Sequence, residues 1–113
     1  MLNTGTAKEI IRDFISACAE NKINFRKVIL FGSIVSGKNH EYSDIDLALV
    51  SDQFSGNSIK DWHEMSLVIV KDKKFYNIEP HTYTTKEFEN GDDPFVEEVV
   101  KKTGIEISLN NSK

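Results

Sequence analysis

Two acidic residues separated by one apolar residue, Asp44 and Asp46, are the feature of the sequence best suited to chemistry. They begin the segment 44–50, whose alternating and apolar residues predict a β-strand. Successive side chains on a strand point to opposite faces, so the two carboxylates would project from the same side. Carboxylate oxygens are hard ligands that suit divalent cations. The pair therefore predicts a metal site on a rigid strand.

A Gly-Ser turn, Gly32 and Ser33, follows the apolar segment 28–31 and precedes the acidic pair. Glycine has no Cβ, so the backbone can turn sharply there and approach a ligand closely. Ser33 can cap a following helical turn or donate its hydroxyl to a phosphate. Backbone N–H groups at a helix start point toward anionic oxygens. The turn therefore predicts phosphate binding beside the metal site.

A strand predicted over residues 75–83 supplies the candidate for a third carboxylate, Glu79. Its alternation places Glu79 and His81 on one face, and the alternative for Glu79 is an exposed strand acid with no role. His81 is interpreted either as a proton acceptor or orienting group near the site, or as a structural histidine. Pro80 cannot donate to a strand ladder, which predicts an edge strand or a bulge.

These residues carry a resemblance to a known family. Gly32-Ser33, followed eleven positions after Ser33 by Asp44-x-Asp46, resembles the signature of the polymerase-β-like nucleotidyltransferases. Within that superfamily the short chain resembles the minimal nucleotidyltransferases (MNT type). The segments 78–81, 93–96 and 103–105 also resemble the small bacterial and archaeal members. The resemblance extends from about residue 6 to residue 108.

The resemblance implies an α+β, two-layer fold: a small mixed β-sheet with helices packed mainly on one face, in a single domain over residues 1–113. It implies transfer of a nucleoside monophosphate, AMP from ATP by analogy with the family, to a hydroxyl of a protein or RNA. Two Mg²⁺ or Mn²⁺ ions would assist, held by Asp44, Asp46 and Glu79 as catalytic residues. Glu79 would also activate the acceptor hydroxyl, and Gly32 and Ser33 would hold the phosphates.

The chain departs from the family pattern just after the turn. Family members often carry a small residue and then Arg before a glycine, whereas the order here is Val35-Ser36-Gly37-Lys38. Lys38 is either a substitute phosphate ligand or a solvated loop lysine. The two residue types are not equivalent, because only Arg can bind a phosphate with a planar, bidentate group.

Minimal nucleotidyltransferases are often partnered with a helical HEPN-type protein, which is an RNase toxin in many such pairs. The resemblance therefore implies an antitoxin role, by nucleotidylation of the partner or by binding it. A non-catalytic nucleotide-binding or partner-binding regulatory module is the alternative, and a homo-oligomer is compatible with the sequence.

Composition limits the possible partners. The 113 residues are 39% apolar and 28% charged, which is typical of a soluble globular domain with one core. The net charge of −4 argues against tight binding to a long nucleic-acid template. No apolar stretch approaches membrane-spanning length, which predicts a cytoplasmic protein without membrane contact. Cys18, the one cysteine, is predicted to be a small buried residue.

Other elements follow from helical periodicity and capping residues. A helix is predicted over 6–22 with a capping box from Thr6 and Glu9. A second is predicted over 58–70, with Ile59, Trp62, Met65 and Ile69 on its buried stripe. Trp62 is thus assigned to the core in preference to a base-stacking role, and 67–70 is also compatible with a strand. One helical turn is predicted over 85–90. A further helix begins at Asp93-Pro94 and ends at Gly104.

Overall fold

The computed structural model describes residues 3–38 and 44–109. Its elements are the helices α1 (Thr4–Glu20), α2 (Ser33–Ser36), α3 (Ser58–Ile69), α4 (Thr85–Glu89) and α5 (Lys101–Thr103), the 3₁₀ turn η1 (Lys73–Phe75), the π-helical segment η2 (Val96–Val100), and the strands β1 (Lys27–Phe31), β2 (Ile45–Val50), β3 (Ile78–Tyr83) and β4 (Ile105–Glu106). The four strands form one sheet in the order β3-β2-β1-β4. β1 is antiparallel to β2 and β4, whereas β2 and β3 are parallel. The predicted α+β class with a mixed sheet is confirmed.

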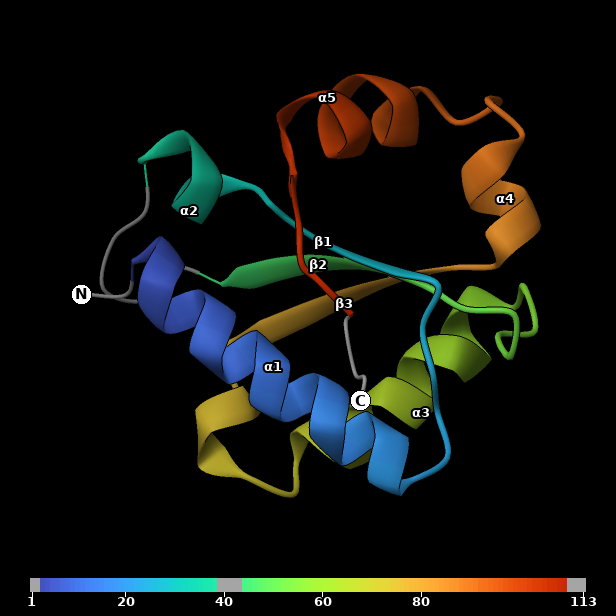
Figure 1. The fold of residues 1–113 in the computed structure, drawn as a ribbon. Coiled ribbons are helices and arrows are strands. Elements are labelled where there is room, and N and C mark those ends of the chain that lie inside the picture. The colour runs from blue at the N-terminus through green and yellow to red at the C-terminus, as the bar shows by residue number, and fades with distance from the viewer. Residues whose placement is uncertain (1–2, 39–43, 110–113) are drawn as a thin grey trace.

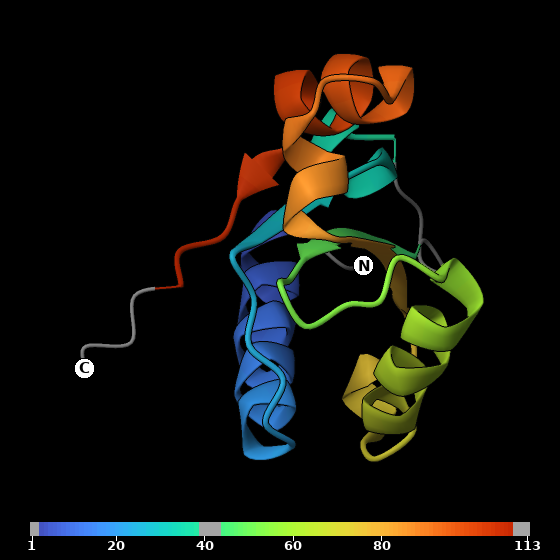
Figure 2. The same ribbon diagram turned by 90° about the vertical axis from the view of Figure 1, so that its right-hand side faces the viewer.

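Helices cover both faces of this sheet. The two longest, α1 and α3, lie together on one face (Figure 1). The shorter C-terminal elements α4, η2 and α5 lie on the opposite face, which is clearest in the rotated view of Figure 2. This second group of helices gives the opposite face a small core of its own.

Strand β2 contributes side chains to both cores, because successive residues point to opposite faces of the sheet. Ile45, Leu47 and Leu49 are fully buried in the larger core against α1 and α3. Ala48 and Val50 point the other way, into the smaller core with Phe88, Val96 and Val100. Asp46 shares the face of Ala48 by the same alternation. The acidic side of β2 is therefore the side covered by the C-terminal helices.

Helix α1 begins two residues earlier than predicted. Its N-cap is Asn3, whose side-chain oxygen accepts a hydrogen bond from the Thr6 backbone N–H at 2.9 Å. The predicted capping box with Thr6 as the cap is therefore wrong, since Asn3 satisfies that donor first. The buried residues of α1 recur at helical spacing and include Ile11, Phe14 and Cys18, which confirms the predicted burial of Cys18. Burial raises the pKa of the Cys18 thiol to about 12, as expected of an inert core cysteine.

Helix α3 is rotated relative to its predicted stripe. Met65 is buried, but Ile59 is 80% exposed and Trp62 51% exposed, so their assignment to the core is wrong. The buried positions of α3 are Asp61, Met65 and Val68. Asp61 points inward because its carboxylate accepts bonds from the Ser55 backbone and hydroxyl, both at 2.9 Å, and from Gly56 N at 3.1 Å. Those bonds decide the rotation, and periodicity alone could not reveal them.

Strand β3 is shorter than the predicted 75–83, because the chain forms η1 before it. Phe75 belongs to η1, and its ring packs edge-on against the ring of Phe14, with ring centroids 5.4 Å apart. β3 lies at one end of the strand order, which confirms the edge position predicted from Pro80. The start of the last helical region is also confirmed, since the Asp93 carboxylate accepts a bond from Phe95 N at 2.9 Å. None of the helices in the described ranges 3–38 and 44–109 is long and apolar enough to cross a membrane.

Candidate active site

Parallel pairing of β2 with β3 brings two acidic residues side by side. In this register Asp46 lies opposite Glu79, and Ala48 lies opposite His81. Asp46 is half-buried and Glu79 is exposed. Two neighbouring carboxylates repel each other unless a proton or a cation intervenes. This pairing of two residues more than thirty positions apart in the sequence thus creates a local site that attracts cations.

His81 joins this pair. Its Nε2 lies 3.3 Å from Oδ1 of Asp46. One ligand atom from each of Asp46, Glu79 and His81 falls within 4.8 Å of the others, a spacing compatible with a single metal ion. The alternation predicted for this strand is confirmed for Glu79 and His81. The structure therefore adds a nitrogen donor to the carboxylates expected from sequence.

Asp44 occupies a different position from the other two acids. It lies one residue before β2 and is exposed. It is absent from the group of converging donors, yet its charge acts on Glu79. The pKa of Glu79 is raised, first by partial burial and then by the charge of Asp46, with a smaller contribution from Asp44, while His81 opposes the shift. The three predicted acids thus share one region, with Asp44 at its margin.

Position 32 has to be glycine because the Asp46 carboxylate lies close to its backbone. Its φ of +89° and ψ of −154° belong to a backbone region that residues with a side chain rarely adopt. A Cβ at this position would overlap the Asp46 carboxylate. The register agrees, because Phe31, directly before Gly32, pairs with Asp46 across β1 and β2. The absence of a side chain on Gly32 therefore makes room for the carboxylate.

Ser33 opens the short helix α2 directly after Gly32, as predicted, and is half-buried. Gly37 ends that helix in the left-handed conformation, with φ of +79°. The Lys38 backbone N–H then bonds to the Ser33 carbonyl at 3.0 Å, and its side chain is exposed. The end of β1, α2 and the starts of β2 and β3 all lie at the same end of the sheet (Figure 1). The predicted phosphate-binding residues Gly32, Ser33 and Lys38 therefore follow β1 at the same end of the sheet as the acids.

Two phenylalanines that the sequence did not single out for function surround the His81 ring. Phe31 meets it edge-on, with ring centroids 5.0 Å apart. Phe95, at the start of η2, stacks on it at 6.5 Å with an interplanar angle of 27°. Phe31 and Phe95 also contact each other at 5.5 Å. Phe95 precedes η2 in a helix that the sequence predicted, and only the tertiary structure places its ring beside His81.

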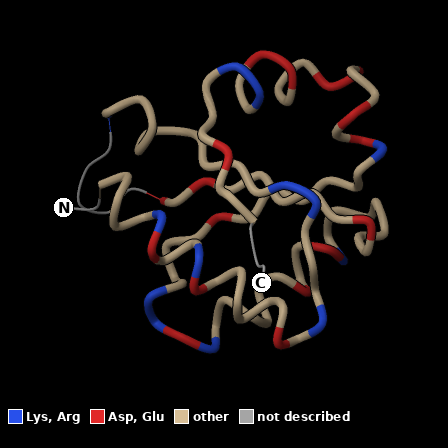
Figure 3. The backbone as a smooth tube through the Cα atoms, viewed as in Figure 1, with Lys and Arg blue, Asp and Glu red and all other residues tan. Residues whose placement is uncertain are grey.

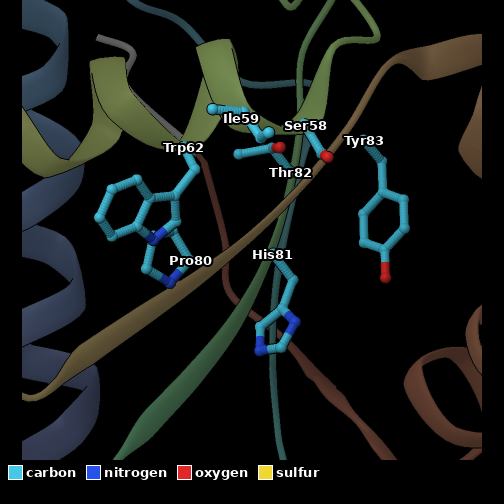
Figure 4. Close-up of a pocket in the computed structure, with 7 residues that line it drawn as sticks. All are labelled: Ser58, Ile59, Trp62, Pro80, His81, Thr82 and Tyr83. Atoms are coloured by element: carbon cyan, nitrogen blue, oxygen red, sulfur yellow. The ribbon is translucent and has the colours of Figure 1, made fainter.

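A pocket of about 420 Å³ lies between α3 and β3, and His81 is in its lining. Figure 4 shows Trp62 beside Pro80, with His81 and Tyr83 pointing away from α3. The other lining residues are Ser58, Ile59 and Thr82. The partly exposed Trp62 and the exposed Ile59 thus line a cavity that also borders His81. No lysine, arginine or carboxylate lines it among the described residues.

Comparison with known proteins decides the family. The sequence model of the nucleotidyltransferase domain matches residues 11–107, which is most of the chain and includes every candidate site residue. The chain belongs to the nucleotidyltransferase domain family. The narrower MNT subgroup is not distinguished by this match. None of the curated proteins matches the chain at a significant level.

A solved structure supports the fold of this nucleotidyltransferase domain. It is a Sulfolobus solfataricus protein provisionally assigned as a nucleotidyltransferase, with 23% sequence identity. The alignment covers 88% of this chain and 74% of that one, with a TM-score of 0.52. At this identity the similarity concerns the fold. General nucleotidyl transfer follows from the family, and the roles of individual residues are argued below.

Proposed function

We propose that this nucleotidyltransferase domain moves AMP from ATP to a hydroxyl group of an acceptor molecule. The observation that carries the proposal is the pairing of Asp46 with Glu79 across β2 and β3, beside the turn at Gly32, in a chain of this family. Carboxylates held on adjacent strands keep their separation without large loop movements. Such preorganisation is what a phosphoryl-transfer site needs.

The residues present fit a divalent cation. Asp46 and Glu79 offer oxygen donors close enough to share one ion, and Asp44 adds negative charge at the margin. Asp44, Asp46 and Glu79 are therefore the proposed ligands of Mg²⁺ or Mn²⁺, and two ions could be shared among them. When bound, such ions neutralise phosphate charge and polarise the reacting phosphorus centre.

The reaction exchanges one bond to phosphorus for another, and the protein residues orient the phosphates and accept the proton that is released. The acceptor oxygen forms a bond to the α-phosphorus of ATP, while the bond from that phosphorus to the oxygen bridging toward the β-phosphate breaks. Pyrophosphate leaves with the electron pair of the broken bond. A Glu79 carboxylate oxygen accepts the proton of the acceptor hydroxyl. Gly32 and Ser33 orient the β- and γ-phosphates, and Lys38 supplies a positive charge toward them.

The acceptor is proposed to lie on the β3 side of the acids. The sheet order places the turn after β1 on one side of β2 and the pocket between β3 and α3 on the other. The lining of this pocket is uncharged and partly aromatic. Such a lining favours a protein side chain as the acceptor over an RNA end, because binding of RNA would require basic groups. Figure 3 shows the lysines and arginines spread along the described backbone and interspersed with acids.

The antitoxin role rests on the resemblance to HEPN-paired proteins. A helical partner could bind the exposed surface of α3 at Ile59 and Trp62. Coexpression with a helical protein encoded by a neighbouring gene, followed by mass spectrometry of that protein, tests this role. An added mass of one nucleoside monophosphate would support it, whereas binding without added mass would favour the non-catalytic alternative.

The first test of the proposed activity is calorimetric titration of each nucleoside triphosphate with Mg²⁺ or Mn²⁺. We expect metal-dependent binding, tightest for ATP, that is lost in Asp46→Asn. The matched control is Asp13→Asn, an exposed acid of α1 whose ion pair with Lys74 at 3.1 Å is of little energetic weight. Folded wild-type protein that binds no triphosphate would contradict the proposal.

A further inference from the structure

The donors that converge most closely in this site differ from the three acids expected of the family. Asp46, Glu79 and His81 form the convergent group, and Asp44 is outside it. His81 is thus closer to the centre of the cluster than an acid that the sequence places in the metal site. Imidazole is also chemically different from a carboxylate, since it is a neutral nitrogen ligand.

The separation of the donor atoms is compatible with a shared ion as well as with a hydrogen bond. Nε2 of His81 and Oδ1 of Asp46 are 3.3 Å apart, slightly beyond the range of about 2.7–3.2 Å usual for N–H···O bonds. Two ligands at right angles around an ion with bonds of about 2.1 Å lie about 3 Å apart. The observed distance is close to that value. Asp46 and His81 are therefore spaced as neighbouring ligands.

The ring of His81 is held in this orientation by its surroundings. Phe31 packs edge-on against it at 5.0 Å, and Phe95 stacks on it at 6.5 Å. The strand register fixes its backbone opposite Ala48, two residues from Asp46 on the same face of β2. Ligands whose orientation is fixed by neighbouring groups lose little freedom when a metal binds. The aromatic contacts therefore prepare the nitrogen to coordinate.

We propose that His81 is a direct nitrogen ligand of the metal held by Asp46 and Glu79, and that it shifts the selectivity of the site from Mg²⁺ toward first-row transition ions. Mg²⁺ prefers an all-oxygen octahedral shell and seldom exchanges an oxygen for nitrogen. Transition ions accept mixed nitrogen and oxygen ligands. This inference rests on the metal site of the proposed function, and it adds a ligand and a selectivity to that site.

The test uses Mn²⁺ as the probe, because its unpaired electrons report directly bonded nitrogen in pulsed electron paramagnetic resonance. The protein is prepared twice, with natural histidine and with ¹⁵N-histidine. Spectra are recorded with Mn²⁺ alone and with Mn²⁺ plus a methylene-bridged ATP analogue that cannot be cleaved. We expect a nitrogen coupling that changes from the ¹⁴N to the ¹⁵N pattern on labelling, which excludes adenine and the nitrogens of all other residue types as its source.

Two variants assign the coupling to His81. His81→Phe keeps an aromatic ring against Phe31 and Phe95 but removes both nitrogens. We expect it to abolish the coupling and weaken Mn²⁺ binding by about tenfold, with a smaller loss for Mg²⁺. His63→Gln is the matched control, because His63 is exposed on α3 and absent from the donor group. It should leave the coupling and both affinities unchanged.

Several outcomes would overturn the inference. Mn²⁺ binding without a label-dependent coupling would leave the metal site intact but make His81 a residue that orients Asp46 by hydrogen bonding. Equal losses of Mn²⁺ and Mg²⁺ affinity in His81→Phe would refute the selectivity. If folded wild-type protein binds no divalent ion, even with the ATP analogue, the proposed function fails together with the inference. A thermal unfolding curve of each variant verifies that it is folded.

Discussion

The two faces of the sheet differ in what their side chains do, although the same strands build both. On the face toward α1 and α3, β2 contributes Ile45, Leu47 and Leu49, all fully buried. On the opposite face the same strand begins with Asp46 and continues into Ala48 and Val50. The first face is closed by two long helices, whereas the second is covered only in part by the shorter C-terminal elements (Figure 2). Asp46, Glu79 and His81 lie on this second face, where Asp46 and His81 are half-buried and Glu79 is exposed.

This difference separates stability from function along a single strand. Apolar burial on the closed face supplies the main stabilising free energy. It permits Asp46 and Glu79 to lie side by side on the other face, where the repulsion between their carboxylates opposes folding. A strand suits this arrangement because adjacent residues point to opposite faces. The comparison predicts opposite consequences for substitutions at neighbouring positions.

The largest effect on stability is expected at Leu47. Leu47→Ala should lower the free energy of unfolding by about 2–5 kcal/mol, because it leaves a cavity in the closed core. Chemical denaturation measures this loss. Asp46→Asn, one residue away, should change stability by less than about 1 kcal/mol, since it removes like-charge repulsion as well as a weak contact to His81. Comparable losses in both variants would contradict the division between the faces.

The next effect is expected at Gly32, where a substitution should damage the site beyond its cost in stability. Gly32→Ala forces a side chain into a positive-φ position and into the Asp46 carboxylate, so we expect a loss of about 1–3 kcal/mol. Titration should also show loss of metal-dependent nucleotide binding.

Gly91→Ala is the matched control, since Gly91 has φ of +80° and an added Cβ there would meet nothing within 4 Å. It should share the backbone strain but retain nucleotide binding. Unchanged binding in Gly32→Ala would show that Asp46 does not need this space.

Asp61 provides a contrast with Asp46, since it is a carboxylate used for structure. It is 3% exposed, and three donors from Ser55 and Gly56 satisfy it. Asp61→Asn should cost about 1–3 kcal/mol, because one oxygen acceptor is replaced by an N–H₂ group that faces donors. The control is Asp72→Asn, whose exposed side chain accepts from Lys74 N at 3.0 Å and forms an ion pair with the Lys74 side chain at 3.8 Å. Because both contacts are exposed, this change should cost less than about 1 kcal/mol. Nucleotide binding should persist in both variants.

The smallest stability effect is expected at Trp62, despite its size. Trp62→Ala should cost less than about 1 kcal/mol, because half of the side chain is already exposed. Met65→Ala on the same helix removes a fully buried side chain and should cost about 2–4 kcal/mol. Thermal unfolding of the pair distinguishes the observed rotation of α3 from the predicted stripe, which would give Trp62 the larger loss.

The local structure of the candidate site was largely predictable because its signals are local. Gly32, Ser33, Asp44 and Asp46 fall within fifteen residues, and the strand alternation that orients Asp46 and Glu79 has a fixed period of two. Helix α3 was harder, since an amphipathic pattern leaves the rotation of a helix open when apolar residues occur on more than one side. The bonds of Asp61 to a loop five or six residues earlier settled that rotation.

By itself the sequence determined the alternation of β2 and β3, the turn at Gly32 and the presence of three acids whose oxygens are of the type that divalent cations prefer. These features depend on backbone geometry and on residue type within short segments. Tertiary structure alone decided that Glu79 lies opposite Asp46 in a parallel pair, that His81 joins them and that Phe31 and Phe95 hold its ring. The reason is that these contacts join segments far apart in the chain. Their register and orientation are fixed by the packing of the whole sheet between its two groups of helices.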